Sequence, residues 1–89
     1  MTETFHKRWW RGTVVSSDGF SIRLRGRSTL VYRDPRGEIE VSTEAMAGSG
    51  FAIAVYADSI EDTPMRRQAQ VMDDIARAFA FAGWTLLPS

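Results

Sequence analysis

Residues 64–82 read PMRRQAQVMDDIARAFAFA, and the pattern of this stretch predicts the helix around which the rest of the chain is arranged. Apolar residues recur at spacings of three and four, which is typical of one face of an amphipathic helix. They are Met65, Ala69, Met72, Ala76 and Phe79, with Ile75 and Ala82 beside them. The opposite, solvated face carries Arg66, Gln70, Asp73, Asp74 and Arg77. Pro64 suits a first helical position and Gly83 the left-handed residue that follows a helix, so we expect a helix from Pro64 to Ala82.

The size and composition of the chain bound what it can be. Its 89 residues, 44% hydrophobic and 25% charged, predict one globular domain over 1–89, with 1–8 as a frayed leader. Cysteine is absent and His6 is the single histidine, so we expect no metal site and no cofactor. No apolar run has the length of a membrane span, and the first twenty residues lack the apolar core of a secretory signal. We therefore expect a cytoplasmic protein without a membrane partner.

The N-terminal half has the alternation of β-strands. Asp18-Gly19 matches a two-residue hairpin turn, which would point Val15 inward opposite Ile22 and leave Val14 outward. A three-residue connection, Arg25-Gly26-Arg27, would then pair Ile22 with Leu30. Strands from about Arg11 are therefore expected to form successive hairpins.

The next turn, Asp34-Pro35-Arg36-Gly37, has proline and glycine where a tight turn favours them. It would pair Tyr32 with Ile39 on the inner face and Arg33 with Glu38 on the outer face. We expect a loop over 42–50, a strand over 51–57 and a last strand over 84–87. Together these elements predict an α+β fold: an antiparallel β-meander sheet of five to six strands, with one C-terminal amphipathic helix packed on one face.

Charge is distributed unevenly along the chain. Residues 1–37 hold eight basic and three acidic residues, a net charge of +5, whereas residues 38–89 hold three basic and eight acidic residues, a net charge of −5. This asymmetry indicates either a nucleic-acid patch or strands that neutralise each other across the sheet. In the nucleic-acid interpretation, Trp10, Arg11, Arg23 and Arg25 would stack bases and pair with phosphates. In the structural one, a tryptophan of the pair Trp9-Trp10 covers the end of a small core.

No pattern in the sequence carries a catalytic mechanism. No serine lies in a nucleophile-elbow pattern, and Gly48-Ser49-Gly50 lacks the lysine of a phosphate-binding loop. The acidic pairs Asp73-Asp74 and Glu61-Asp62 are consecutive, so their carboxylates point in different directions. We therefore expect that the protein is not an enzyme.

The order of several short features resembles the bacterial family called immunity protein seventy-four, whose members are found beside polymorphic toxins. These features are a strand ending in Gly26-Arg27, Leu30-x-Tyr32, Val41-x-x-Glu44, Val55-Tyr56, Ser59-Ile60, Pro64, and a helix with Ile75, Ala78, Phe79, Phe81 and Gly83. The resemblance covers about 12–87. One position departs from it, since Glu61-Asp62-Thr63 stands where a tryptophan is expected before the proline.

The resemblance implies a non-catalytic protein that binds and neutralises a cognate toxin domain. Acidic side chains would then meet a basic toxin and speed association; they are Glu38, Glu40, Glu44, Glu61 and Asp62. Glu44 has a structural alternative, in which it tethers the loop that follows it. Two other functions stay open: a small nucleic-acid-binding protein, and a homo-oligomeric structural protein that associates through strand edges or the outer sheet face.

Overall fold

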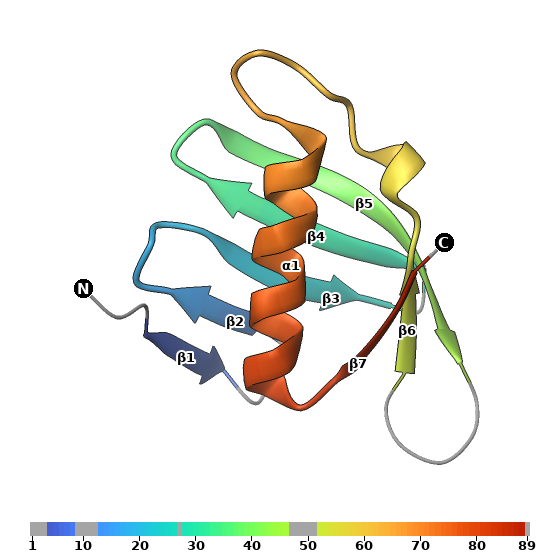
Figure 1. Cartoon of the computed structure of the whole chain (residues 1–89). Coiled ribbons are helices and arrows are strands. Elements are labelled where there is room, and N and C mark those ends of the chain that lie inside the picture. The colour runs from blue at the N-terminus through green and yellow to red at the C-terminus, as the bar shows by residue number, and fades with distance from the viewer. Residues whose placement is uncertain (1–3, 9–12, 27, 47–51, 89) are drawn as a thin grey trace.

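The computed structural model describes residues 4–8, 13–26, 28–46 and 52–88. Within these residues the chain forms a sheet with one α-helix packed on one face, and the sheet curves around the helix (Figure 1). The strands are β1 (Phe5–Arg8), β2 (Thr13–Ser16), β3 (Ser21–Arg25), β4 (Thr29–Asp34), β5 (Gly37–Met46), β6 (Ala52–Val55) and β7 (Thr85–Pro88). The helices are the short 3₁₀-helix η1 (Ala57–Ser59) and α1 (Gln68–Ala82). The predicted α+β class with a C-terminal helix is confirmed.

The seven strands lie in the sheet in chain order, from β1 to β7. Neighbours are antiparallel from β1 to β6, but β7 pairs with β6 in parallel, from Ala52 opposite Thr85 to Val55 opposite Pro88. The parallel pair arises because the chain crosses the sheet through α1 before it returns beside β6 (Figure 1). The prediction of a wholly antiparallel sheet of five to six strands is therefore wrong at its C-terminal edge and in its strand number.

Residues 5–8 form β1, so the prediction of a frayed leader over 1–8 is wrong for this part. Phe5 packs edge-on to Phe20, with ring centroids 6.2 Å apart, and stacks on Phe81 at 5.3 Å. The backbone N–H of Ser17 also donates to the carbonyl of Thr4 at 2.7 Å. Aromatic contacts and backbone hydrogen bonds together hold the strand at the sheet edge.

The register of β2 against β3 differs by one residue from the predicted one. Val14 faces Ile22 across the pair, and Val14 is fully buried whereas Val15 is half-buried on the other face. The reason is the connection, in which three residues, 17–19, lie between paired ends and Gly19 has a φ of +96°. A three-residue loop with a left-handed glycine replaces the two-residue turn, and the extra residue exchanges the two faces of β2.

The later hairpins agree better with the predictions. Ile22 pairs with Tyr32 rather than Leu30, a slip of two residues that leaves each side chain on its expected face. Between β4 and β5 the observed pairs, Tyr32 with Ile39 and Arg33 with Glu38, are the predicted ones. The strand β5 then continues through 42–46, where a loop is expected from the sequence, because residues 43–46 pair with β6.

The helix begins later and presents a different face from the one predicted. It starts at Gln68, whose backbone N–H donates to Asp62 Oδ1 at 2.9 Å, so an acidic side chain upstream caps the first turn. The buried face consists of Val71, Asp74, Ile75, Ala78 and Phe79. Met65 lies outside the helix and is 70% exposed. The predicted ending is confirmed, since Gly83 is the left-handed cap with a φ of +79°.

The core lies between α1 and the inner face of the sheet. It contains buried apolar residues from β2 to β6, from the segment after η1 and from α1. They are Val14, Phe20, Ile22, Leu30, Tyr32, Val41, Ile53, Val55, Ile60, Val71, Ile75, Ala78 and Phe79. Residues that alternate with these along β2 to β5 point to the opposite side of the sheet. We call that side the outer face; its described residues are Thr13, Val15, Ser21, Arg23, Arg25, Thr29, Val31, Arg33, Glu38, Glu40 and Ser42.

Candidate functional site

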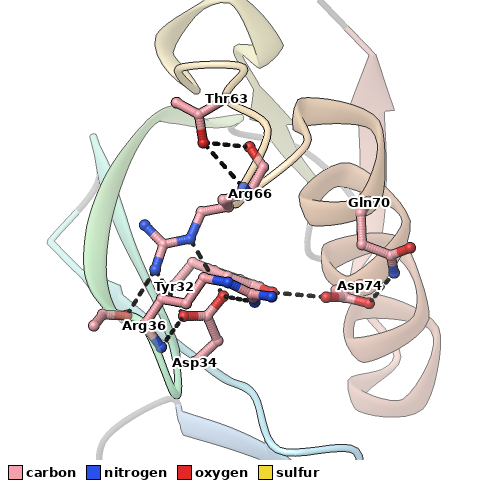
Figure 2. Close-up of polar contacts among 8 residues, drawn as sticks. Tyr32, Asp34, Arg36, Thr63, Arg66, Gln70 and Asp74 are labelled. Carbon is pink, nitrogen blue, oxygen red and sulfur yellow. Dashed lines mark hydrogen bonds and ion pairs between the residues drawn. The ribbon is translucent and has the colours of Figure 1, made fainter.

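Asp74 is a buried carboxylate on the side of α1 that faces the sheet. It is 6% exposed and accepts hydrogen bonds from Tyr32 Oη at 2.7 Å and from Gln70 Nε2 at 2.9 Å (Figure 2). Arg77 also donates to it. Burial and the bond to Asp74 raise the pKa of Tyr32 well above its usual range, so the hydroxyl stays protonated and donates. The Tyr32–Asp74 bond joins β4 to the middle of the helix.

Asp34, at the end of β4, holds the segment that leads into α1. Arg66 donates to it through Nη2 at 2.7 Å and Nε at 3.2 Å, and the same Nη2 donates to the carbonyl of Gly37 at 3.2 Å (Figure 2). The hydrogen bond from Arg66 holds the pKa of the Asp34 carboxyl below its usual range. A bidentate pair of this kind fixes segment 61–67 against the turn between β4 and β5.

We call Tyr32, Asp34, Arg66, Asp74 and Arg77 the polar network. A groove of about 560 Å³ opens beside these residues, between α1, the segment before it and the β2–β3 and β4–β5 turns. Arg77 also pairs with Asp73 and Asp18, at 3.0 and 3.5 Å. Among the described residues, no buried side-chain nitrogen or oxygen atom lacks a hydrogen-bond partner. The network is therefore a satisfied cross-link between helix and sheet.

The outer face is the second candidate region. Neither α1 nor any other described element lies over β2 to β5 on this side (Figure 1). It contains an open, shallow depression of about 720 Å³. The side chains of Thr13, Val15, Ser21, Arg23, Val31, Arg33 and Glu38 line it. Val31 is only 5% exposed, so the longer side chains around it rise above an apolar floor.

The charged residues of the outer face fall into two groups. Arg25 forms an ion pair with Glu40, in which both side chains remain more than half exposed. In the described part of the chain, the side chains of Arg23, Arg33 and Glu38 form no hydrogen bond or ion pair, although Arg33 and Glu38 are directly opposite in register. The outer face therefore has charges that are free to contact a partner.

The structure separates the acidic residues that the sequence assigned to one partner surface. Glu38 and Glu40 lie on the outer face, but Glu61 and Asp62 lie in the segment before α1, on the helix side of the sheet. Asp62 pairs with Arg67 at 2.9 Å in addition to capping the helix. Glu44 accepts a hydrogen bond from Tyr56 Oη at 2.7 Å, which joins β5 to the residue after β6.

The residues of the nucleic-acid interpretation are only partly placed. Arg23 and Arg25 lie on the outer face, two residues apart on β3. Trp10 and Arg11 lie outside the described residues, as does the other tryptophan of the pair, Trp9. The structure therefore tests neither the stacking role of Trp10 nor the core role of its neighbour.

Sequence reasoning missed the polar network. Asp74 was assigned to the solvated face of the helix and Asp34 only to a turn, and their partners Tyr32 and Arg66 come from distant parts of the chain. One signal was available: a helical stripe through Val71, Ile75 and Ala78 is more apolar than the stripe through Met65 and Ala69. That stripe brings position 74 to the inner face.

Across the described ranges, no group of three or more histidine, cysteine, aspartate or glutamate residues is arranged to hold a metal ion. No helix in the described part of the chain is both long and apolar enough to cross a membrane.

These features define a small α+β domain in which one helix is cross-linked to the inner face of a curved sheet and the outer face is open. Comparisons of the chain with protein-family models, with curated protein sequences and with solved structures found no match.

Proposed function

We propose that this chain is a non-catalytic protein-binding module of the immunity type, which neutralises a bacterial toxin domain by binding it through the outer face. The observation that carries the proposal is the open depression over β2 to β5, with charged side chains standing around an apolar floor. Protein interfaces combine a central apolar area with a charged, solvated rim. The toxin as partner comes from the resemblance to immunity protein seventy-four in the order of short sequence features.

The construction of the domain favours this use. Backbone hydrogen bonds hold β2 to β5 in register, and the polar network fixes α1 behind them. The backbone of such a surface loses little conformational freedom when a partner binds, which lowers the entropic cost of association. The depression is open to solvent rather than enclosed, which suits a partner's surface better than a small molecule, most of whose area is buried in a typical ligand pocket.

Nucleic-acid binding is the second candidate because Arg23 and Arg25 share the outer face. Two observations make it weaker. Arg25 is paired with Glu40, and Phe20, the aromatic residue among the described residues that line the depression, is only 5% exposed, so its ring is not open to a stacking base. Homo-oligomerisation through a sheet edge or the outer face is the third candidate, and the mass of the protein in solution tests it.

The test of the proposed function compares two tryptophan substitutions. Ser21→Trp fills the depression from its floor, and Ala69→Trp adds the same ring on an exposed position of α1. Each tagged protein is incubated with nuclease-treated lysate of the source cell, and captured proteins are identified by mass spectrometry. Each captured protein is then expressed alone and together with the chain.

We expect the wild type and Ala69→Trp to capture one protein that arrests growth when expressed alone, and to restore growth on co-expression. Ser21→Trp should fail in both assays while retaining the circular dichroism spectrum of the wild type. If no captured protein arrests growth, or if Ser21→Trp protects as well as the wild type, the proposed function is wrong.

A further inference from the structure

We infer that the outer-face depression receives a protein surface rich in carboxylate groups, and that Arg23 and Arg33 are the residues that bind them. This inference rests on the proposed function and names the chemistry of the partner. It starts from the charges of the outer face, because these decide which surfaces can approach it.

Arg23 and Arg33 lie at diagonal positions on neighbouring strands. Arg23 is opposite Val31, and Arg33 is opposite Ser21. Diagonal neighbours of this kind lie about 7–8 Å apart, so the two guanidinium groups can reach the same part of a partner. Both side chains line the depression, and Arg33 is exposed. Each guanidinium presents a planar fork of donors that matches a carboxylate.

The other charges of the face cancel this pair only in part. Arg25 and Glu40 neutralise each other. Glu38 lies beside Arg33 on β5 and borders the depression, so the excess positive charge is greatest on the Arg23 side, between β3 and β4. The apolar side chains of Val15 and Val31 lie between these groups and give a partner's apolar side chain a place to contact.

An acidic protein fits this arrangement better than nucleic acid does. A nucleic-acid strand presents a continuous row of phosphates, and Glu38 on β5 would repel it on one side of the depression. Phe20, the aromatic residue among the described lining of the depression, is only 5% exposed and therefore offers bases little ring surface. A protein surface offers a few carboxylates that match two arginines.

This inference reverses the charge of the partner expected from the sequence. Of the five acidic residues proposed there, Glu40, Glu44 and Asp62 are already bonded to Arg25, Tyr56 and Arg67. Their carboxylates would have to leave these partners before they could meet a basic toxin. Arg23 and Arg33 have no such bond to break in the described part of the chain.

The experiment uses two labelled probes: a polyglutamate peptide of about 20 residues, which is the acidic probe, and oligothymidylate of about 20 nucleotides, which is the competing probe. Binding of each probe is measured by fluorescence anisotropy at low and at high salt, which shows how far it depends on charge. The test variant is Arg23→Gln with Arg33→Gln. The control is Arg36→Gln with Arg67→Gln, which removes the same charge from two exposed arginines on the helix side.

We expect the wild type and the control to bind polyglutamate with affinities within threefold of each other, and the test variant to bind at least tenfold more weakly. Glu38→Gln should strengthen binding, whereas Glu61→Gln, which removes an exposed acid far from the depression, should not. Thermal melting monitored by circular dichroism verifies that each variant is folded.

Three results would overturn the inference: no polyglutamate binding by the wild type, equal binding by the test variant, or tighter binding of oligothymidylate that depends on Arg23 and Arg33. None of them bears on the growth assay with Ser21→Trp. Growth rescue without polyglutamate binding would leave the proposed function standing and refute the acidic partner. The reverse combination would refute the immunity role alone.

Discussion

Asp74 is a carboxylate that the fold can bury only because three donors reach it. Tyr32 arrives from β4, while Gln70 and Arg77 lie within one turn of it on α1. Removing one donor from a buried carboxylate lowers the stability of the fold more than removing an exposed hydrogen bond does, because water cannot reach the carboxylate to replace the lost donor. The polar network therefore specifies how α1 is placed against the sheet.

Tyr32→Phe tests the contribution of this contact. The variant keeps the ring against Phe20, with which Tyr32 stacks at 5.8 Å, and deletes only the donor to Asp74. We expect the free energy of unfolding, measured with urea, to fall by about 1–3 kcal/mol. Tyr56→Phe is the matched control, since its hydroxyl bonds Glu44 at the surface, and it should change stability much less than Tyr32→Phe does. Equal losses would contradict the assigned role of Asp74.

The Asp34 carboxylate should make the stability of the fold depend on pH. Its pKa in the folded protein is lowered by Arg66, below the value of about 3.9 in an unfolded chain. A lowered pKa contributes stability that is complete above the unfolded pKa and is lost as the pH falls through the folded one. Asp34→Asn should therefore be less stable than the wild type by about 1–3 kcal/mol at pH 7.

The difference in the free energy of unfolding between the wild type and Asp34→Asn should stay constant down to about pH 5 and become smaller below about pH 4. Urea unfolding of both proteins at a series of pH values measures it. A difference that widened on acidification would show that the Asp34 carboxylate is not the stabilising form.

The hairpin between β2 and β3 carries a prediction at the level of the element. Val14 is fully buried and Val15 half-buried on the outer face, so Val14→Ala leaves a core cavity and Val15→Ala does not. We expect a loss of about 2 kcal/mol for Val14→Ala and less than about 1 kcal/mol for Val15→Ala in urea unfolding. The opposite order would support the two-residue turn and contradict the observed register.

The hairpins also show what the sequence can predict about an element. The turn between β4 and β5 was predicted with its pairs because Pro35 and Gly37 suit only one arrangement there. Asp18-Gly19 suits both a two- and a three-residue loop, and adjacent valines give no preference for either face. Register in β2 is thus decided by packing against distant residues, which no local pattern records.

The helix, like the hairpins, could be predicted only in part from the sequence. Its existence and its end at Gly83 follow from periodicity and capping. Its buried face does not follow from these patterns. A charged residue at position 74 is expected to face solvent, and only the fold shows that Tyr32 lies opposite it. The parallel pairing of β7 could not be predicted either, since the pattern of a short apolar strand does not indicate whether it pairs in parallel or antiparallel.

In the molecule as a whole, the polar network and the core lie on one side of the sheet, and the other side is open. The sequence predicted the α+β class and named residues of both faces, but it grouped acidic residues that the fold sets on opposite sides of the sheet. Candidate sites depend on which side chains face together and which are already bonded, and both properties follow from the fold.

The most direct test of binding through the outer face is an amide ¹H–¹⁵N titration of the labelled protein with the polyglutamate peptide. We predict that the largest shifts occur at Thr13, Val15, Ser21, Arg23, Val31 and Arg33, with little change along the exposed side of α1. Shifts centred on α1 or on segment 61–67, or no shifts on the outer face, would contradict the account.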